Sequence, residues 1–147
     1  MSTQYIMEAL VLSGIAMGLV GNSRPASGAE HHLAHYWEMD ALSKGVEHPL
    51  HGNSVGVGTV IIASIYEMAD IKSKYGIHVP KPQEIQQMLK SAGACDNPAN
   101  LGISGQLFHR SVLHALEVRP RYTVLQYAND SGLLEKYTDK LTERFYD

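Results

Sequence analysis

Cysteine is almost absent from this sequence, with Cys95 the only one among 147 residues. An intramolecular disulfide is therefore impossible, and zinc sites built from several cysteines are excluded. This usage fits a reducing, cytoplasmic setting. Any metal must instead be held by histidines and carboxylates, and eight histidines are present.

Positive charge is also scarce, since 12 Lys and Arg stand against 15 Asp and Glu, giving a net charge of -3. No dense basic stretch could neutralise a run of phosphates, so nucleic acid is not an expected partner. A chain of this length with 44% hydrophobic residues can bury one sizeable core. We therefore expect a single domain over residues 1–147.

The long apolar run at residues 9–21 lacks the features of a signal or membrane segment. No Lys or Arg precedes it, Glu8 abuts it, and about 13 residues fall short of the roughly 20 that span a bilayer. We expect no membrane partner and predict a buried helix over residues 3–20. Gly14 and Gly18 would lie on one face of it, where a neighbouring helix could approach closely.

The remaining hydrophobic periodicity predicts an all-α fold. We expect helices over residues 29–44, 53–74, 82–90, 106–117, 123–129 and 133–145. Loops are expected at 23–28 and 93–105. The segment 53–74 is too long for a strand and too apolar for a surface helix, so it is predicted to be the buried central helix. Residues 122–125 are the only stretch that also fits a strand.

A nucleotide-binding signature is missing. No Gly-x-Gly-x-x-Gly follows a predicted strand, and Gly56-Val57-Gly58 lies in the wrong context for a Rossmann turn. Nothing in the sequence predicts that this chain binds NAD alone.

Two features predict a site. His31 and His35 are four residues apart, so the predicted helix places both on one face, where they could share a ligand, while His32 points elsewhere. Histidines at this spacing also occur where they only pack or hydrogen-bond. His51 is the second feature, at the mouth of the central helix beside small residues that allow close approach of backbone or ligand. Taken alone, His51 also fits a structural role.

Together, histidines on two helices with a carboxylate and an open water position are typical of a catalytic zinc-type site. The nearby acids are Glu30, Glu38, Asp40 and Glu47. Their positions in the sequence do not select one of them as the third ligand.

The string SRPASGAEHHLAH at residues 23–35, followed by Trp37-Glu38-Met39 and by His51-Gly52, resembles the signature region of glycerol-1-phosphate dehydrogenases. These belong to the iron-containing alcohol dehydrogenase and dehydroquinate synthase superfamily. Weaker similarity at residues 121–125 extends the resemblance across essentially the whole chain. It implies a helical bundle like the C-terminal metal-binding domain of dehydroquinate synthase-like enzymes.

The resemblance also implies roles for individual residues. His31 matches the first metal-binding histidine, His51 the second, and His35 the histidine that contacts substrate beside the metal. The implied metal is Zn or Ni, and the implied reaction is reversible reduction of dihydroxyacetone phosphate by NAD(P)H to sn-glycerol 1-phosphate, a step of phospholipid metabolism. No catalytic residue is assigned. Arg24, in the loop before the metal helix, is a candidate ligand for the substrate phosphate, with a surface or salt-bridging role as the alternative.

The chain departs from the family at its start. The family's third ligand, an aspartate, and its nucleotide-binding domain would both precede Met1, so NAD(P) is expected only with a missing N-terminal domain. One interpretation is a metal- and substrate-binding half, inactive alone, that works with a separate nucleotide-binding subunit. Another is a non-catalytic helical module with a vestigial metal site. Dehydroquinate synthase is disfavoured by the string at residues 23–35. A helical half without its partner domain would expose the apolar face that lies between the two, and this exposure predicts a homo-oligomer.

Overall fold

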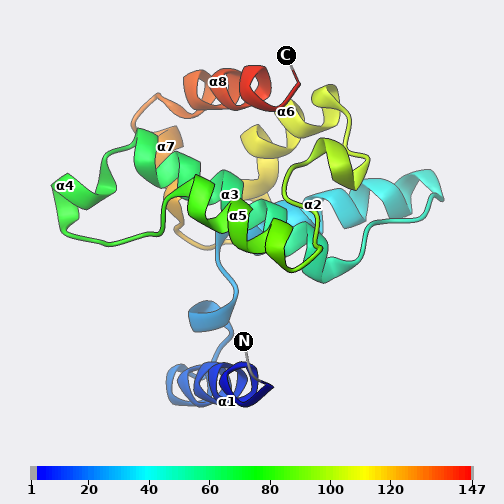
Figure 1. The fold of residues 1–147 in the computed structure, drawn as a ribbon. Helices are drawn as coiled ribbons and strands as arrows, with labels where there is room; N and C mark the ends of the chain where they lie inside the picture. Colours follow the sequence, from blue (N-terminus) through cyan, green and yellow to red (C-terminus); the bar gives the residue numbers. More distant parts are fainter. Residues whose placement is uncertain (1–2, 147) are drawn as a thin grey trace.

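The computed structural model describes residues 3–146, which form α-helices, three short 3-10 helices and, within that range, no strand. The all-α expectation is confirmed (Figure 1). The α-helices are α1 (Thr3–Val20), α2 (Ala29–Lys44), α3 (His51–Met68), α4 (Ile71–Tyr75), α5 (Pro82–Ser91), α6 (Gly105–His114), α7 (Val124–Asp130) and α8 (Leu134–Tyr146). The 3-10 helices are η1 (Arg24–Ala26), η2 (Ala99–Leu101) and η3 (Ala115–Glu117).

Helix α3 is the centre of the core, as the sequence predicts. It packs on α2, α5, α7 and α8, and its Val57, Ile61 and Ile65 are fully buried. Its β-branched residues have low intrinsic helix propensity, so burial of their side chains stabilises the helix instead. Trp37 of α2 packs in the same core, and its indole N–H donates a hydrogen bond of 2.9 Å to Ser111 Oγ of α6.

Helices α2 and α3 touch backbone to backbone at Gly58. A Cβ atom at this position would lie 2.8 Å from the backbone oxygen of Glu30. Only glycine allows this approach, which brings the first turn of α2 against α3. The contact lies one residue from His31, so it also fixes how the two histidine-bearing helices meet.

The predicted boundaries need one correction at the end of the central helix. The segment 53–74 is not continuous, because α3 ends at Met68 and a short α4 follows. Asp70, between them, adopts a left-handed conformation with φ of 53°. Aspartate tolerates this conformation better than most residues, and it ends the helical hydrogen-bond ladder. The other predicted helices are found within a few residues of their expected bounds, and residues 122–125 form the entry to α7 rather than a strand.

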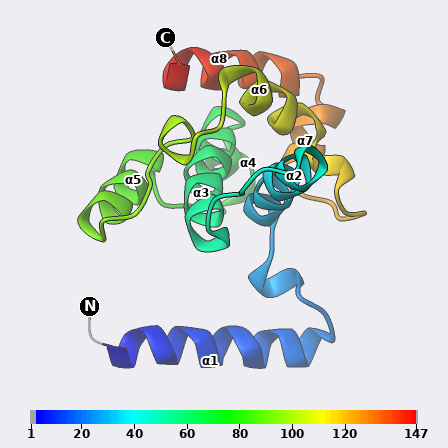
Figure 2. The ribbon, with the colours of Figure 1, turned by 90° about the vertical axis from the view of Figure 1, so that its right-hand side faces the viewer.

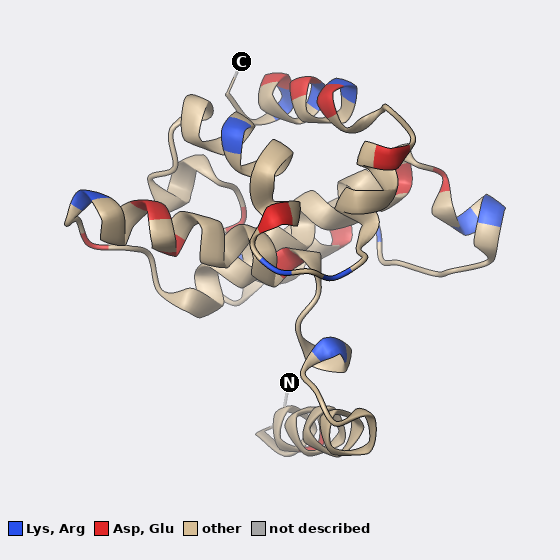
Figure 3. Cartoon of the chain, turned by 180° about the vertical axis from the view of Figure 1, so that it is seen from behind, with Lys and Arg blue, Asp and Glu red and all other residues tan. Residues whose placement is uncertain are grey.

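The predicted burial of the first helix is wrong for the described residues. Helix α1 has no buried residue, and nothing lies within 4 Å of where a Cβ atom at Gly14 or Gly18 would be. Figures 1 and 2 show α1 apart from the other helices, joined to them through η1, on which it packs. Figure 3 shows it nearly free of charged residues. Among the described helices, only α1 is long and apolar enough to cross a membrane. A single helix of this kind near the N-terminus is weak evidence for a membrane span.

Candidate functional site

Three histidines converge where the first turns of α2 meet the start of α3. His31 and His35 lie one turn apart on α2, and His51 is the first residue of α3. The ring centres are 5.5 Å apart for His31 and His51, 5.3 Å for His35 and His51, and 6.4 Å for His31 and His35. The structure therefore brings together all three histidines that the sequence singles out.

Glu38 joins two of these histidines. Its Oε1 accepts a hydrogen bond of 2.5 Å from Nδ1 of His51, and its Oε2 accepts one of 3.1 Å from Nδ1 of His35. Burial by itself would raise the pKa of Glu38, but the hydrogen bonds from His51 and His35 outweigh it and lower the pKa below the usual value. Glu38 is therefore ionised at neutral pH and fixes the orientation of both rings.

Glu30 supports His31 in the same way. Its Oε1 accepts hydrogen bonds from Nδ1 of His31 at 2.8 Å and from the backbone N–H of Gly28 at 2.7 Å. Burial opposes ionisation of Glu30, yet these hydrogen bonds lower its pKa below the usual value. A carboxylate on Nδ1 leaves the Nε2 lone pair of the ring as the site for an electrophile.

Two donor sets could hold a divalent ion here. His31 and His51 each have Nδ1 held by a carboxylate, the arrangement typical of metal-binding histidines. Two imidazoles on one tetrahedral zinc have ring centres about 5 Å apart, given Zn–N bonds of about 2.0–2.1 Å, which is close to their 5.5 Å separation. The alternative is His35, Glu38 and His51, whose ligand atoms lie within 4.8 Å of one another.

His35 is less available than the other two rings. Its Nδ1 donates to Glu38, and its Nε2 accepts a hydrogen bond of 3.2 Å from Nη2 of Arg119. Both ring nitrogens are thus occupied, whereas His31 and His51 keep Nε2 unengaged among the described residues. His31 and His51 therefore have Nε2 available to a metal ion, whereas the ring nitrogens of His35 are engaged.

His32 turns away from the cluster, as the sequence predicts. It is fully buried, and neither of its ring nitrogens has a hydrogen-bond partner among the described residues. Burial lowers its pKa, and the positive charges of Arg121 and Arg119 lower it further. His32 is therefore a neutral part of the core.

The sequence does not reveal the part played by the segment 119–123. Arg119 contacts His35, while Arg121 donates to the backbone oxygen of Ser27 and to Oγ of Ser23, both at 2.9 Å. These residues lie more than 80 positions from His31 and His35 along the chain. The signal that could have found them is a pair of arginines around Pro120 in a chain otherwise poor in positive charge.

The remaining acids and histidines lie outside the cluster. Asp40 pairs with Lys44 and Arg110, and Glu47 is exposed in the loop between α2 and α3. His109 contacts Asp139 and His114 contacts Glu117 on the surface.

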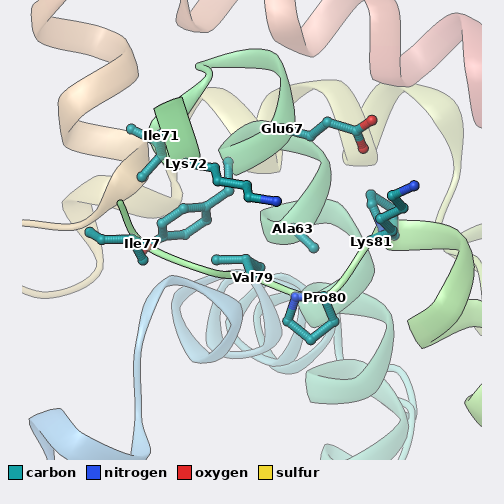
Figure 4. A pocket seen from close by; sticks show the side chains of 10 residues that line it. Ala63, Glu67, Ile71, Lys72, Ile77, Val79, Pro80 and Lys81 are labelled. Carbon is teal, nitrogen blue, oxygen red and sulfur yellow. The ribbon is translucent and has the colours of Figure 1, made fainter. Parts of the chain in front are cut away.

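An apolar cavity of about 170 Å³ lies elsewhere, between α3, α4 and the segment 77–82 (Figure 4). It is lined by none of the histidines. Ile77, Val79 and Pro80 form one wall, with Glu67 and Lys72 at its edge. We therefore treat the histidine cluster, and not this cavity, as the candidate site.

An all-α domain in which histidines from two helices converge, each backed by a carboxylate, belongs to the class of domains suited to binding a divalent metal. Comparison with known proteins identifies its relatives. The chain is 36% identical to glycerol-1-phosphate dehydrogenase [NAD(P)+] of Halalkalibacterium halodurans over 86% of its length, matching 38% of that protein. The corresponding values are 37%, 90% and 40% for the Geobacillus stearothermophilus protein of the same name. They are 34%, 99% and 35% for that of Methanoregula boonei.

The chain is therefore related, over nearly its whole length, to one part of the glycerol-1-phosphate dehydrogenases. It spans less than half the length of these relatives. No family model matches it. The resemblance drawn from the string at residues 23–35 is thus confirmed.

Proposed function

We propose that this chain is the metal- and substrate-binding part of an NAD(P)-dependent sn-glycerol-1-phosphate dehydrogenase, and that it is inactive alone. The observation that carries the proposal is the cluster of three histidines, formed by the same segments that resemble the dehydrogenases. Hydride transfer between NAD(P)H and dihydroxyacetone phosphate then also requires a nucleotide-binding part. The alternative is a non-catalytic helical module with a vestigial metal site.

His31 and His51 are the proposed metal ligands, through Nε2. The donor set fits, because neutral imidazoles whose Nδ1 faces a carboxylate suit Zn²⁺ or Ni²⁺. When bound, such an ion supplies Lewis-acid polarisation of the substrate's oxygens. Glu30 and Glu38 fix the orientations of the His31 and His51 rings through hydrogen bonds from Nδ1.

His35 is the proposed substrate contact, since its ring lies beside His51 and its Nε2 faces Arg119. With Nδ1–H directed at Glu38, Nε2 of His35 is the acceptor of the ring, and a substrate hydroxyl would replace Arg119 as its donor. Arg24 is the proposed ligand of the substrate phosphate, because it precedes the metal helix and a guanidinium matches phosphate geometry. No catalytic acid or base is assigned.

Calorimetric titration with Zn²⁺ and Ni²⁺ tests the metal site. We expect the metal affinity to fall at least tenfold in His31→Ala and in His51→Ala, because each removes one of two nitrogen ligands. His35→Ala should stay within a few-fold of the wild-type chain. Loss of binding in His35→Ala with binding kept in His31→Ala would instead assign the site to His35, Glu38 and His51. No metal binding by the wild-type chain would favour the non-catalytic alternative.

Glu38→Gln is expected to weaken metal binding by about 10-fold to 100-fold, the usual effect of removing a carboxylate that orients a ligand histidine. An amide oxygen can accept from only one ring while the NH₂ group opposes the other Nδ1–H. Affinity measured by competition with a chelator checks this. Glu47→Gln, which changes the same charge in an exposed loop, is the control. A loss equal to that of His51→Ala would show that Glu38 binds the ion directly.

Further expectations follow from the same proposal. We expect the chain to act in the cytoplasm, in phospholipid metabolism, with glycerol 1-phosphate or dihydroxyacetone phosphate as substrate and NAD(P) bound only through the nucleotide-binding part. An open reading frame nearby that encodes a glycine-rich nucleotide turn and an aspartate-bearing helix would support the separate subunit. Mixing the two purified proteins and measuring NADPH oxidation with dihydroxyacetone phosphate would then test activity directly.

A further inference from the structure

The apolar cavity between α3, α4 and the segment 77–82 has the features of a binding site of its own (Figure 4). It encloses about 170 Å³, and although α3 contributes to it, none of the three clustered histidines lines it. An apolar protein cavity of about 150 Å³ can hold a benzene molecule. The space therefore fits an apolar body of about six carbons. Its apolar walls are formed by Ala63, Ile71, Ile77, Val79, Pro80 and Pro82.

The wall formed by the segment 77–82 is held in place by the backbone. Gly76 ends α4 in a left-handed conformation with φ of 68°, which directs the chain out of the helix. Pro80 and Pro82 have a fixed φ, and Pro82 is buried at the start of α5. The backbone N–H of Lys81 donates a hydrogen bond of 3.3 Å to Oε2 of Glu84. Because the wall is ordered in advance, a ligand loses little affinity in fixing it.

The lining of the cavity favours an apolar molecule over water. The buried polar side-chain atoms that lack a hydrogen-bond partner within residues 3–146 belong to His32, Ser54 and Thr123, none of which lines the cavity. A space without such groups offers water too few partners. Ile77 and Val79 are 49% and 36% exposed, so a ligand in the cavity would also remove apolar surface from water.

The charged residues at the edge of the cavity favour an anion. Lys72 and Lys81 line it together with a single acid, Glu67, so two positive charges and one negative charge leave a net charge of +1. Figure 4 shows Lys72 extending across the cavity, with Glu67 and Lys81 near its other side. Within residues 3–146 none of the three forms an ion pair. Both ammonium groups can therefore pair with a carboxylate of a ligand.

We propose that this cavity binds a small monocarboxylate with an apolar tail of about six carbons. The tail fills the space beside Ala63 and Val79, and the carboxylate lies at the edge, paired with Lys72 and Lys81. Lysine ammonium groups are point charges on flexible stems, so they select the head group by its charge and not by its shape. The site is separate from the histidine cluster and does not depend on the proposed function.

Titration of the full chain with heptanoate, followed through the amide chemical shifts in NMR spectra, tests this proposal. We expect saturable shifts in residues 63–82 and a Kd on the order of 1 mM, in keeping with so small a ligand. 1-Hexanol has the same apolar tail without charge, and hexylamine has it with a positive charge. Loss of two exposed ion pairs should make hexanol bind about three- to tenfold more weakly than heptanoate, and hexylamine should bind more weakly still.

Removal of both lysines tests the selection of the head group. Lys72→Gln combined with Lys81→Gln should lower the affinity for heptanoate to that for hexanol and leave the affinity for hexanol unchanged. Lys140→Gln, at an exposed position on α8, is the matched control and should bind heptanoate as the wild-type chain does. Equal affinity of the wild-type chain for heptanoate and hexylamine would contradict the assignment of an anion.

Filling the cavity tests the place of binding. Ala63 is a buried lining residue, so Ala63→Leu puts its larger side chain in the space of the tail, and both heptanoate and hexanol should bind at least tenfold more weakly. Circular dichroism verifies its fold, and Val79→Ser, at a partly exposed position, should weaken both ligands without overpacking. Heptanoate binding should persist in His51→Ala. Absence of saturable shifts around the cavity, or shifts confined to the exposed apolar surface of α1, would overturn the proposal.

Discussion

Gly58→Ala is expected to destabilise the fold and to disable the histidine cluster at the same time. The added Cβ would lie 2.8 Å from the backbone oxygen of Glu30, and backbone cannot swing aside as a flexible side chain can. Overpacking of this kind costs about 1–3 kcal/mol in free energy of unfolding. That cost exceeds the gain of up to about 1 kcal/mol that alanine gives over glycine in a helix. Thermal and urea unfolding measure the net loss.

The substitution should also disturb the site in molecules that stay folded. Relief of the clash moves α2 away from α3 at a point next to His31, while His51 moves with α3. A shift of about 1 Å is enough to misplace ligands that must be held within about 0.5 Å. We therefore expect zinc affinity to fall at least tenfold in the folded variant.

Gly52→Ala is the control for this substitution. It makes the same change in the same helix, but nothing lies within 4 Å of the new Cβ atom. The free energy of unfolding should stay the same or rise by about 0.5–1 kcal/mol, because alanine restricts the unfolded chain. Equal behaviour of the two variants would mean that the backbone contact at Gly58 does not set the helix spacing.

Hydrophobic periodicity predicts most of the fold because most helices other than α1 bury one face, and α3 buries every residue from Val60 to Ile65. The break after Met68 escapes it, since the apolar pattern continues through Ile71 while the interruption depends on the left-handed backbone of Asp70. Aspartate is common in ordinary helices as well as in such breaks. Local pattern therefore predicts the number of helical segments less well than their location.

In the candidate site, too, contacts between residues close in sequence could be predicted, whereas contacts between distant segments could not. The shared face of His31 and His35 follows from helical spacing alone. Glu38 is three residues after His35, and this spacing favours it over Glu47 as a partner of that histidine. That Glu38 also bonds His51 depends on how α3 packs on α2, which the local sequence does not show. Arg119 could not have been found in this way, because its contact with His35 joins segments 84 residues apart.

Helix α1 shows the limit of an argument from composition. Its apolar surface predicts burial, yet the pattern cannot say whether the covering surface lies in the same chain. Within residues 3–146 no residue of α1 is buried, so its large side chains are exposed. The exposed apolar residues of α1 are Tyr5, Ile6, Met7, Leu10, Val11, Leu12, Ile15, Leu19 and Val20.

Deletion of residues 1–21 is therefore expected to change the purified chain from a self-associated species to a monomer. In water, each Å² of apolar surface that α1 buries on association lowers the free energy by about 25 cal/mol. With no partner present, another copy of α1 is the surface available at high concentration. Size-exclusion chromatography with light scattering, over a range of protein concentrations, measures the change.

The deletion should leave the rest of the molecule intact, because no residue of α1 is buried against it. We expect the thermal midpoint of the truncated chain, compared at high dilution, to match that of the full chain within a few degrees. Leu10→Lys with Ile15→Lys should reproduce the loss of association while keeping the helix, since both side chains are exposed. Gln4→Lys adds charge to the same helix without removing apolar surface, and association should persist in it.

A full-length chain that is monomeric at high concentration would contradict the expectation. Unfolding of the truncated chain would show that α1 packs on the other helices in solution. A partner that covers α1 would then have to bind it more strongly than those helices do.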